Sequence, residues 1–106
     1  VGNYLFTVSL EGYLIVIEKK SGNIIKITDI FKNFKKKKRD KIKPIGFVVG
    51  LKNIYLTTDN GRMLVIDTKT GQTNSILKID NDKISRPFIL NKDLFVIKDN
   101  AIIKIE

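Results

Sequence analysis

The sequence predicts an all-β fold, a partial β-propeller of about two to three four-stranded antiparallel blades taken from a longer chain. Three observations predict it: an internal repeat, turn residues at fixed positions in that repeat, and short β-prone runs between the turns. The 106 residues are enough for one small domain, and 42% of them are hydrophobic, which is enough for a core. The composition therefore predicts a folded chain and excludes a disordered or fibrous one.

Two segments, residues 10–18 and 59–67, share one pattern and lie 49 residues apart. Each contains a Gly, one further residue, four apolar residues and an acid, and each has a second Gly ten residues after the first. A weaker third copy at residues 98–106 has Asn100 in place of the turn Gly, and Asn tolerates the positive φ of a tight hairpin. Because the second offset is 39 residues, the period is about 40 residues, with an insertion between the first two copies.

Ten strands are predicted from β-prone runs that turn residues separate. They cover residues 4–9, 13–18, 24–30, 44–50, 53–58, 62–67, 73–79, 86–90, 94–98 and 101–105. Five residues between them are predicted as structural turns: Gly12, Gly22, Gly61, Gly71 and Asn100. No helix is expected beyond at most one turn near residues 30–34, because the apolar residues of that region cluster at one end and its lysines repel one another.

The pattern of side chains also predicts burial. Residues 14–17 and 63–66 are apolar without alternation, which indicates strands that are buried on both faces. Thr57 and Thr58 stand where a strand approaches its turn, so we expect them nearer to solvent. Three tyrosines are expected to pack between blades: Tyr4, Tyr13 and Tyr55.

The repeat divides the chain into four parts. They are a partial three-stranded blade at 1–31, a basic insertion loop at 32–43, a complete blade at 44–80, and a partial three-stranded C-terminal blade at 81–106. The chain begins with Val1 instead of Met and has no signal-peptide pattern. We therefore expect a longer parent protein, whose N-terminal region would carry the signal that determines its cellular compartment.

Most of the net charge of +9 is concentrated in one segment. Residues 31–43 hold eight of the twenty basic residues and a single acid, so the rest of the chain is close to neutral. Five consecutive residues are candidates for contact with an anionic partner: Lys35, Lys36, Lys37, Lys38 and Arg39. The alternative is a solvated loop that keeps the protein soluble. A nucleic-acid surface is disfavoured because aromatic residues do not alternate with the charges.

The residue types that are absent exclude several classes of chemistry. The chain has no Cys and no His, so disulfides, thiolate nucleophiles and the commonest general base and metal ligand are missing. No apolar run approaches the roughly 18 residues of a membrane-spanning helix. Residues 80–82 lack the Gly and the distal Glu of a calcium-binding loop. Glu18 and Asp67 occupy equivalent repeat positions and are predicted to be hairpin residues, so we predict no catalytic residue, cofactor or metal site.

Residues 65–72, Val-Ile-Asp-Thr-Lys-Thr-Gly-Gln, resemble the repeat of the pyrroloquinoline-quinone-like propellers, whose motif runs Ala-x-Asp-x-x-Thr-Gly-Lys-x-x-Trp. Residues 16–23 are a looser version. The resemblance implies a propeller fold but specifies function poorly. Lys26 and Ser75 stand where the motif has the Trp that locks adjacent blades together in that family. The cofactor-stacking aromatics, calcium ligands and catalytic Asp of quinone dehydrogenases do not map onto this chain.

Within that family the chain looks most like the C-terminal part of the propeller lipoprotein of the bacterial outer-membrane β-barrel assembly machinery. This implies a non-enzymatic, protein-binding scaffold, periplasmic and associated with the outer membrane, whose partners are assembly subunits or unfolded β-barrel clients. Two alternatives stay open: a piece of a quinone-dependent dehydrogenase, and a ligand-sensing propeller module. The isolated chain is expected either to associate with copies of itself through its open faces and edges or to lose order at its ends.

Overall fold

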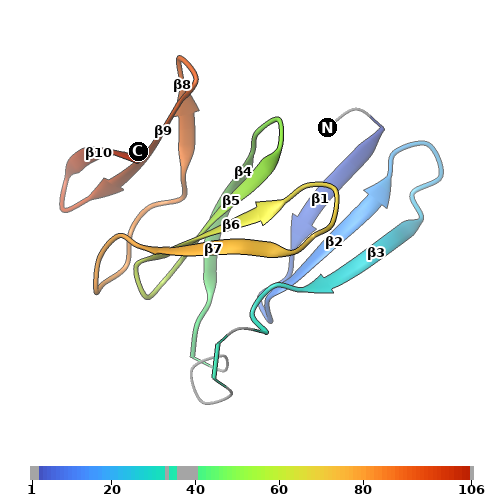
Figure 1. The fold of residues 1–106 in the computed structure, drawn as a ribbon, viewed down its shortest axis with the longest axis horizontal. Helices are drawn as coiled ribbons and strands as arrows, with labels where there is room; N and C mark the ends of the chain where they lie inside the picture. The colour runs from blue at the N-terminus through green and yellow to red at the C-terminus, as the bar shows by residue number, and fades with distance from the viewer. Residues whose placement is uncertain (1–2, 33, 36–40, 106) are drawn as a thin grey trace.

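A computed structural model describes residues 3–32, 34–35 and 41–105, and every regular element within them is a β-strand (Figure 1). The strands are β1 (Tyr4–Val8), β2 (Tyr13–Glu18), β3 (Ile24–Asp29), β4 (Pro44–Val49), β5 (Asn53–Thr58), β6 (Arg62–Asp67), β7 (Thr73–Lys78), β8 (Phe88–Leu90), β9 (Asp93–Lys98) and β10 (Ala101–Ile105). The predicted all-β fold class is confirmed, and each predicted strand is present with ends that differ by two residues at most.

The strands form three antiparallel sheets that stand side by side (Figure 1). The first sheet has the order β1-β2-β3, the second β4-β5-β6-β7, and the third β10-β9-β8. Strands β4 and β8, which begin the second and third sheets along the chain, approach each other. The molecule is flat, with extents of 42 × 38 × 20 Å. This is the arrangement of adjacent blades that fan out from a common side.

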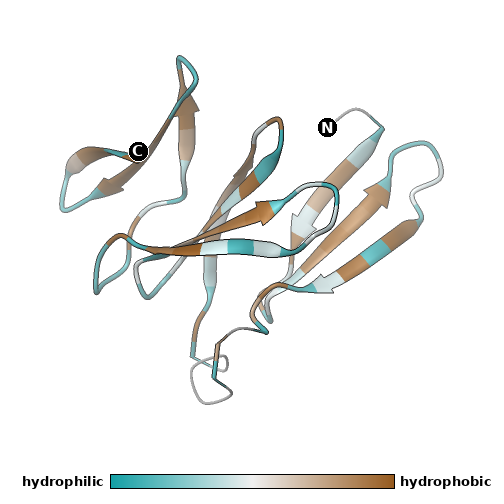
Figure 2. Ribbon diagram, viewed as in Figure 1, coloured by the Kyte–Doolittle hydropathy of each residue, from teal (hydrophilic) through white to brown (hydrophobic). Residues whose placement is uncertain are grey.

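The first and second sheets each bury one face against the sheet that follows in the chain. Leu14 of β2 is buried against Ile54, Leu64 and Ile66 of the second sheet. Met63, which stands at the position of Leu14 in the repeat, is buried in the same way against the third sheet. The brown apolar segments of Figure 2 run along the central strands of the sheets. The repeat in sequence is therefore a repeat in packing.

The second core lies between the second and third sheets. Met63 and Val96 are fully buried there, together with Ile84 of the segment that connects the two sheets. The side chain of Ser85 accepts a hydrogen bond from the backbone N–H of Ile97 at 2.7 Å, and this contact fixes the connecting segment to β9. Packing and hydrogen bonding thus join the third sheet to the second.

The predicted burial on both faces is found in β6 but only in part in β2. In β6 the residues Met63, Leu64 and Ile66 are all fully buried, because a sheet lies on each side. In β2 only Leu14 is fully buried. The side chains of Tyr13, Ile15 and Ile17 alternate with it and belong to a face that no described sheet covers, so Tyr13 is exposed and the two isoleucines are half-buried.

Two burial predictions are wrong. Thr57 and Thr58 are fully buried. The hydroxyl of Thr58 bonds with the side chain of Asn60, and that of Thr57 donates to the carbonyl of Gly46 at 3.5 Å, so both polar groups are satisfied inside the protein. Two of the three tyrosines predicted to pack between blades are exposed: Tyr13, on the outward face of the first sheet, is 39% exposed, and Tyr4, at the start of β1, is 42% exposed. Only Tyr55 packs against the core between the second and third sheets.

The five turn residues all adopt positive φ. The angles are +93° at Gly12, +73° at Gly22, +77° at Gly61, +74° at Gly71 and +63° at Asn100. Gly71 also lies against the first sheet, where a Cβ atom at this position would be 2.7 Å from Oγ1 of Thr28. Gly22 holds the equivalent turn position but has open space around it. The two glycines share a backbone requirement and differ in their contact with a neighbouring sheet.

This difference yields a matched pair of substitutions. We expect Gly22→Ala to lower the free energy of unfolding by about 1 kcal/mol, the cost of left-handed backbone for a residue with a Cβ atom. Gly71→Ala carries that cost and must also displace Thr28, so we expect a further loss of roughly 1–3 kcal/mol. Urea denaturation of both variants measures the difference. Equal losses would mean that contact with the first sheet does not constrain Gly71.

The outward faces of the first and third sheets generate a second prediction. Ile27 is 59% exposed on one of them and Ile102 is 69% exposed on the other. We expect the 106-residue chain to self-associate as its concentration rises, because such apolar faces favour burial. Sedimentation velocity should show less association for Ile27→Lys and Ile102→Lys but not for Leu51→Lys, which changes an exposed Leu outside both faces. A chain that stays monomeric at high concentration contradicts the prediction.

Candidate functional site

A cleft of about 420 Å³ opens between the first and second sheets. Phe6 of β1 and Leu14 and Val16 of β2 line one wall. These three side chains share a face because Phe6 pairs with Val16 across the ladder, and Leu14 stands two residues before Val16 on the same strand. The opposite wall comes from the turns at one end of the second sheet, including Leu51 and Thr68. The cleft therefore has an apolar wall on the first sheet and a wall of turns on the second.

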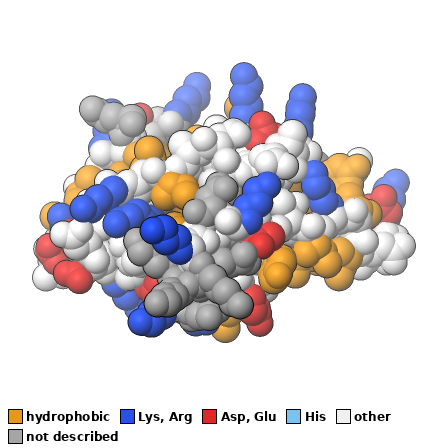
Figure 3. All heavy atoms as spheres, turned by 60° about the horizontal axis from the view of Figure 1, so that its bottom comes forward, with side chains coloured by type: hydrophobic (Ala, Val, Ile, Leu, Met, Phe, Trp, Pro, Cys, Tyr) orange, Lys and Arg blue, Asp and Glu red, His pale blue; other side chains and the backbone are white. Residues whose placement is uncertain are grey.

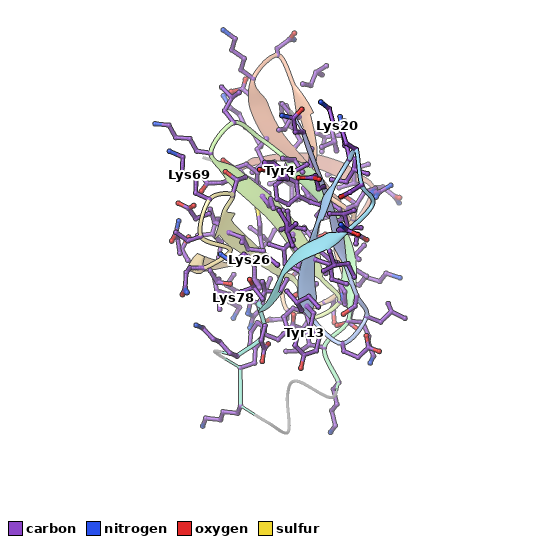
Figure 4. All side chains as sticks on the ribbon, turned by 90° about the vertical axis from the view of Figure 1, so that its right-hand side faces the viewer. Tyr4, Tyr13, Lys20, Lys26, Lys69 and Lys78 are labelled. Atoms are coloured by element: carbon purple, nitrogen blue, oxygen red, sulfur yellow. The ribbon has the colours of Figure 1, made fainter. Side chains whose placement is uncertain are left out.

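Two lysines stand at this cleft, one from each sheet. Lys26 of β3 and Lys69 of the β6–β7 turn both line it, together with Tyr4 (Figure 4). The Lys26 ammonium donates a hydrogen bond of 2.5 Å to the carbonyl of Thr70 and so spans the gap between the sheets. No Asp or Glu of the described residues lines the cleft. Its local charge is positive.

The β6–β7 turn that carries Lys69 is held by Asp67. The Asp67 carboxylate accepts backbone N–H bonds from Lys69 at 2.7 Å and from Thr70 at 3.0 Å. These bonds stabilise the charged form, so they lower the pKa of Asp67 from 3.8, and the N–H of Thr70 contributes most. The backbone carbonyl of Asp67 accepts a hydrogen bond from the N–H of Gly71 at 2.9 Å. Asp67 therefore serves to shape the turn.

Glu18 occupies the equivalent turn of the first sheet with similar geometry. Its carboxylate accepts the hydroxyl of Ser21 at 2.8 Å, and its backbone carbonyl accepts the N–H of Gly22 at 2.9 Å. Both repeat acids are thus engaged by their own turns and lie on separate sheets. The geometry offers no arrangement in which they act together as an acid–base pair.

Leu51 is the most exposed large apolar side chain of the described residues, at 96%. It stands at the tip of the β4–β5 hairpin and lines both the main cleft and a smaller hollow of about 180 Å³. The smaller hollow is also lined by Lys52 and Asp67. An apolar side chain in this position costs free energy in water and is available to contact a ligand or partner.

The edge of β1 is a second candidate site. The N–H of Ser9 donates to the carbonyl of Tyr13 at 2.9 Å, which identifies Ser9 as part of a hydrogen-bonded pair in the β1–β2 ladder. Because such pairs alternate along antiparallel strands, the backbone groups of Phe6 and Val8 point away from β2. No strand of the described residues pairs with that side of β1.

Of the predicted anionic-partner contacts, the structure describes Lys35, which is exposed. Four lie outside the described residues: Lys36, Lys37, Lys38 and Arg39. Earlier in the segment, Lys32 donates to the side chain of Gln72 at 3.4 Å. Figure 3 shows lysine and arginine side chains spread over one face of the molecule, with hydrophobic patches at both sides. The structure therefore shows only that one of the five residues, Lys35, is exposed to solvent.

Residues 80–82 are held by the protein itself. The Asp80 carboxylate forms an ion pair with Lys98 at 3.4 Å and accepts the N–H of Asn81 at 2.8 Å. Across the residues that the structure describes, no group of three metal-ligating side chains comes together. Within the same residues, no helix is long and apolar enough to cross a membrane.

The cleft was not predicted from the sequence. Its apolar residues are ordinary strand residues in the sequence, and their meeting with Leu51 depends on how two sheets are placed. One signal was present: Lys26 stands where the resembling repeat has Trp. Because a lysine side chain fills less space than an indole ring, Lys26 in place of Trp indicates a gap between the blades at that position.

The fold is shared with several solved structures. No family model and no curated protein matches the sequence. The chain is similar to the β-propeller domain of Cps50 (Swd1) from Myceliophteria thermophila, with a TM-score of 0.73 and 15% identity over 91% of this chain and 32% of that one. It is similar to BamB from Moraxella catarrhalis, with a TM-score of 0.67 and 12% identity over 98% of this chain and 29% of that one.

A third similar structure is the quinohemoprotein alcohol dehydrogenase ADHIIG from Pseudomonas putida, with a TM-score of 0.67 and 18% identity over 91% of this chain and 15% of that one. The chain thus spans 32% or less of each structure. Likeness at these identities establishes the fold alone. The chain has the fold of β-propeller blades.

The Asp67 turn predicts a pH dependence. Because the pKa of Asp67 is lowered in the folded protein, its carboxylate stabilises the fold above the unfolded value of 3.8, and this contribution is lost as the pH falls through the lower folded value. We expect the melting temperature of Asp67→Ala to lie below that of the wild type at neutral pH and to approach it in acid. Asp67→Asn keeps an acceptor oxygen but cannot titrate. The difference in melting temperature between Asp67→Asn and the wild type should likewise shrink in acid. If the difference stays constant with pH for both variants, the ionised Asp67 carboxylate does not stabilise the turn.

Proposed function

We propose that this chain belongs to a non-enzymatic, protein-binding propeller, and that the edge of β1, with which no second strand of the described residues pairs, can receive an extended strand from a partner protein. One observation carries the proposal: the second sheet has a strand at the position beside β1 that no described strand occupies in the first sheet. There, β4 pairs with β5, and Val48 lies opposite Tyr55. Tyr55 stands 49 residues after Phe6, at the same position of the repeat. Strand β4 thus shows the geometry that an added strand would adopt beside β1.

The composition of β1 supports this role. Tyr4–Val8 contains no charged residue and no Pro, which are the features that commonly block pairing at an exposed edge. The outward backbone groups of Phe6 and Val8 provide donors and acceptors in one row. An extended peptide can pair with such an edge by β-augmentation, in which main-chain hydrogen bonds supply affinity.

Two observations support a non-enzymatic role. The sequence contains no His and no Cys, and the acids at equivalent repeat positions, Glu18 and Asp67, are both engaged by their own turns. The competing class is a quinone-dependent dehydrogenase with its active residues in other blades, and a ligand-sensing module is a third. Bound quinone in the full-length protein, detected by absorbance, would favour the dehydrogenase.

We propose further that the parent works in the periplasm, in assembly of outer-membrane β-barrel proteins. The sequence resemblance to the propeller lipoprotein of that machinery supports this, together with the structural likeness to BamB from Moraxella catarrhalis. Unfolded β-barrel clients contain segments that become strands in the folded barrel, and such segments can pair in extended form with a sheet edge. A pull-down with the full-length protein that recovers no assembly subunit or barrel client would count against the proposal.

A pair of substitutions at Val8 tests the edge directly. The probe is a fluorescent peptide with the sequence of one strand of an outer-membrane β-barrel. We expect Val8→Pro to weaken its binding by roughly tenfold, because proline removes an outward N–H and its ring obstructs an incoming strand. Val8→Ala also loses the valine side chain but keeps the N–H, so it should bind within about twofold of wild type. Fluorescence anisotropy measures both affinities.

Two outcomes overturn the edge proposal. The first is equal binding by the proline and alanine variants. The second is slow hydrogen exchange of the Phe6 and Val8 amides in the full-length protein without a partner, because the protein's own chain would then fill this position.

A further inference from the structure

We propose that the cleft between the first and second sheets is a binding site for a small amphiphilic carboxylate, a molecule with an apolar body and one anionic end. This goes beyond strand binding at the β1 edge, because the cleft is formed by side chains and the edge by backbone groups. The volume of about 420 Å³ lies within the range of roughly 300–1,000 Å³ that small-molecule sites occupy.

The apolar wall would hold the body of the ligand. Phe6 and Val16 are half-buried, Leu14 is fully buried, and all three line the cleft. Leu51 projects from the opposite side and is almost fully exposed. A ligand chain between these residues would remove apolar surface of both walls from water, which is favourable in proportion to the area covered.

The charged end would be held by Lys26 and Lys69. The Lys26 ammonium uses one of its three donors on the carbonyl of Thr70, which fixes it beside the opening and leaves two donors for a ligand. Lys69 approaches from the other sheet, so the two positive charges flank the cleft (Figure 4). Hydrogen bonds between an ammonium and a carboxylate are stronger than those between neutral groups.

Two acids lie near this site without lining it, and one of them, Asp67, interacts with the charge of Lys69. Asp67 lies on the smaller hollow, where its carboxylate accepts N–H bonds from Lys69 and Thr70. Glu18 ends β2, and its carboxylate accepts the hydroxyl of Ser21. Neither residue lines the main cleft, so an anion placed there meets ammonium groups and no carboxylate.

The experiment uses octanoate as the probe, with isothermal titration calorimetry on the 106-residue chain. We expect wild-type protein to bind octanoate more tightly than neutral 1-octanol, which has the same chain length. Lys26→Gln should weaken octanoate binding by about tenfold, since a charge-assisted hydrogen bond is lost. Lys78→Gln is the matched control, because it removes an equal charge outside the cleft. It should change the affinity by less than about twofold.

A second pair of variants separates the cleft from the exposed outer face of the first sheet. Val16→Trp fills the cleft and should abolish binding, whereas Ile27→Trp adds the same ring on the opposite face and should not. Amide chemical shifts should change at residues 51 and 68–71 and not at 97 or 102. The proposal fails if octanol binds as well as octanoate, if Lys26→Gln binds like wild type, or if the shifts map to the outer faces. Val8→Pro should leave octanoate binding intact, so the two sites can fail independently.

Discussion

The burial of one sheet face against the next is the interaction on which the rest of this structure depends. Leu14 and Met63 stand at the same repeat position, and each is covered by the sheet that follows. The second sheet is covered on both sides, and its central strands β5 and β6 are therefore the most deeply buried of the described strands. Where a face has no neighbour, the same repeat positions become exposed, as at Ile27. Core and exposed patches follow from one packing rule.

Local contacts fix how closely the first two sheets approach. Gly71 meets Thr28 with no room for a side chain between them, and the Thr73 hydroxyl donates to the carbonyl of Ile30 at 3.3 Å. Both contacts lie near one end of the interface. Nearby, Lys26 spans the gap through its long side chain, and the cleft remains open beside it. The cleft therefore results from two features of the interface between the first and second sheets. The sheets pack tightly at Gly71 and Thr28, and beside this contact the long, narrow side chain of Lys26 does not fill the space between them.

The sequence predicted what depends on local chemistry and missed what depends on the position of other sheets. Strand and hairpin positions could be read because tight turns require residues that tolerate positive φ, as at Gly61 and Asn100. The burial of Thr57 could not be predicted, because its hydroxyl bonds with the carbonyl of Gly46, which lies eleven residues away on another strand. The cleft could not be predicted for the same reason. It exists only once Phe6 and Leu51 have been brought to facing walls.

The two proposed sites exploit opposite properties of the same strand. Along β1, backbone groups of Phe6 and Val8 point to the open edge, where any extended chain can pair with limited regard to its sequence. The Phe6 side chain points instead into the cleft, where size and charge select the ligand. Both sites therefore depend on the extended conformation of β1, which its ladder with β2 maintains from Tyr4 to Val8. A residue of this strand can contribute its backbone to one site and its side chain to the other, because the two groups point in perpendicular directions.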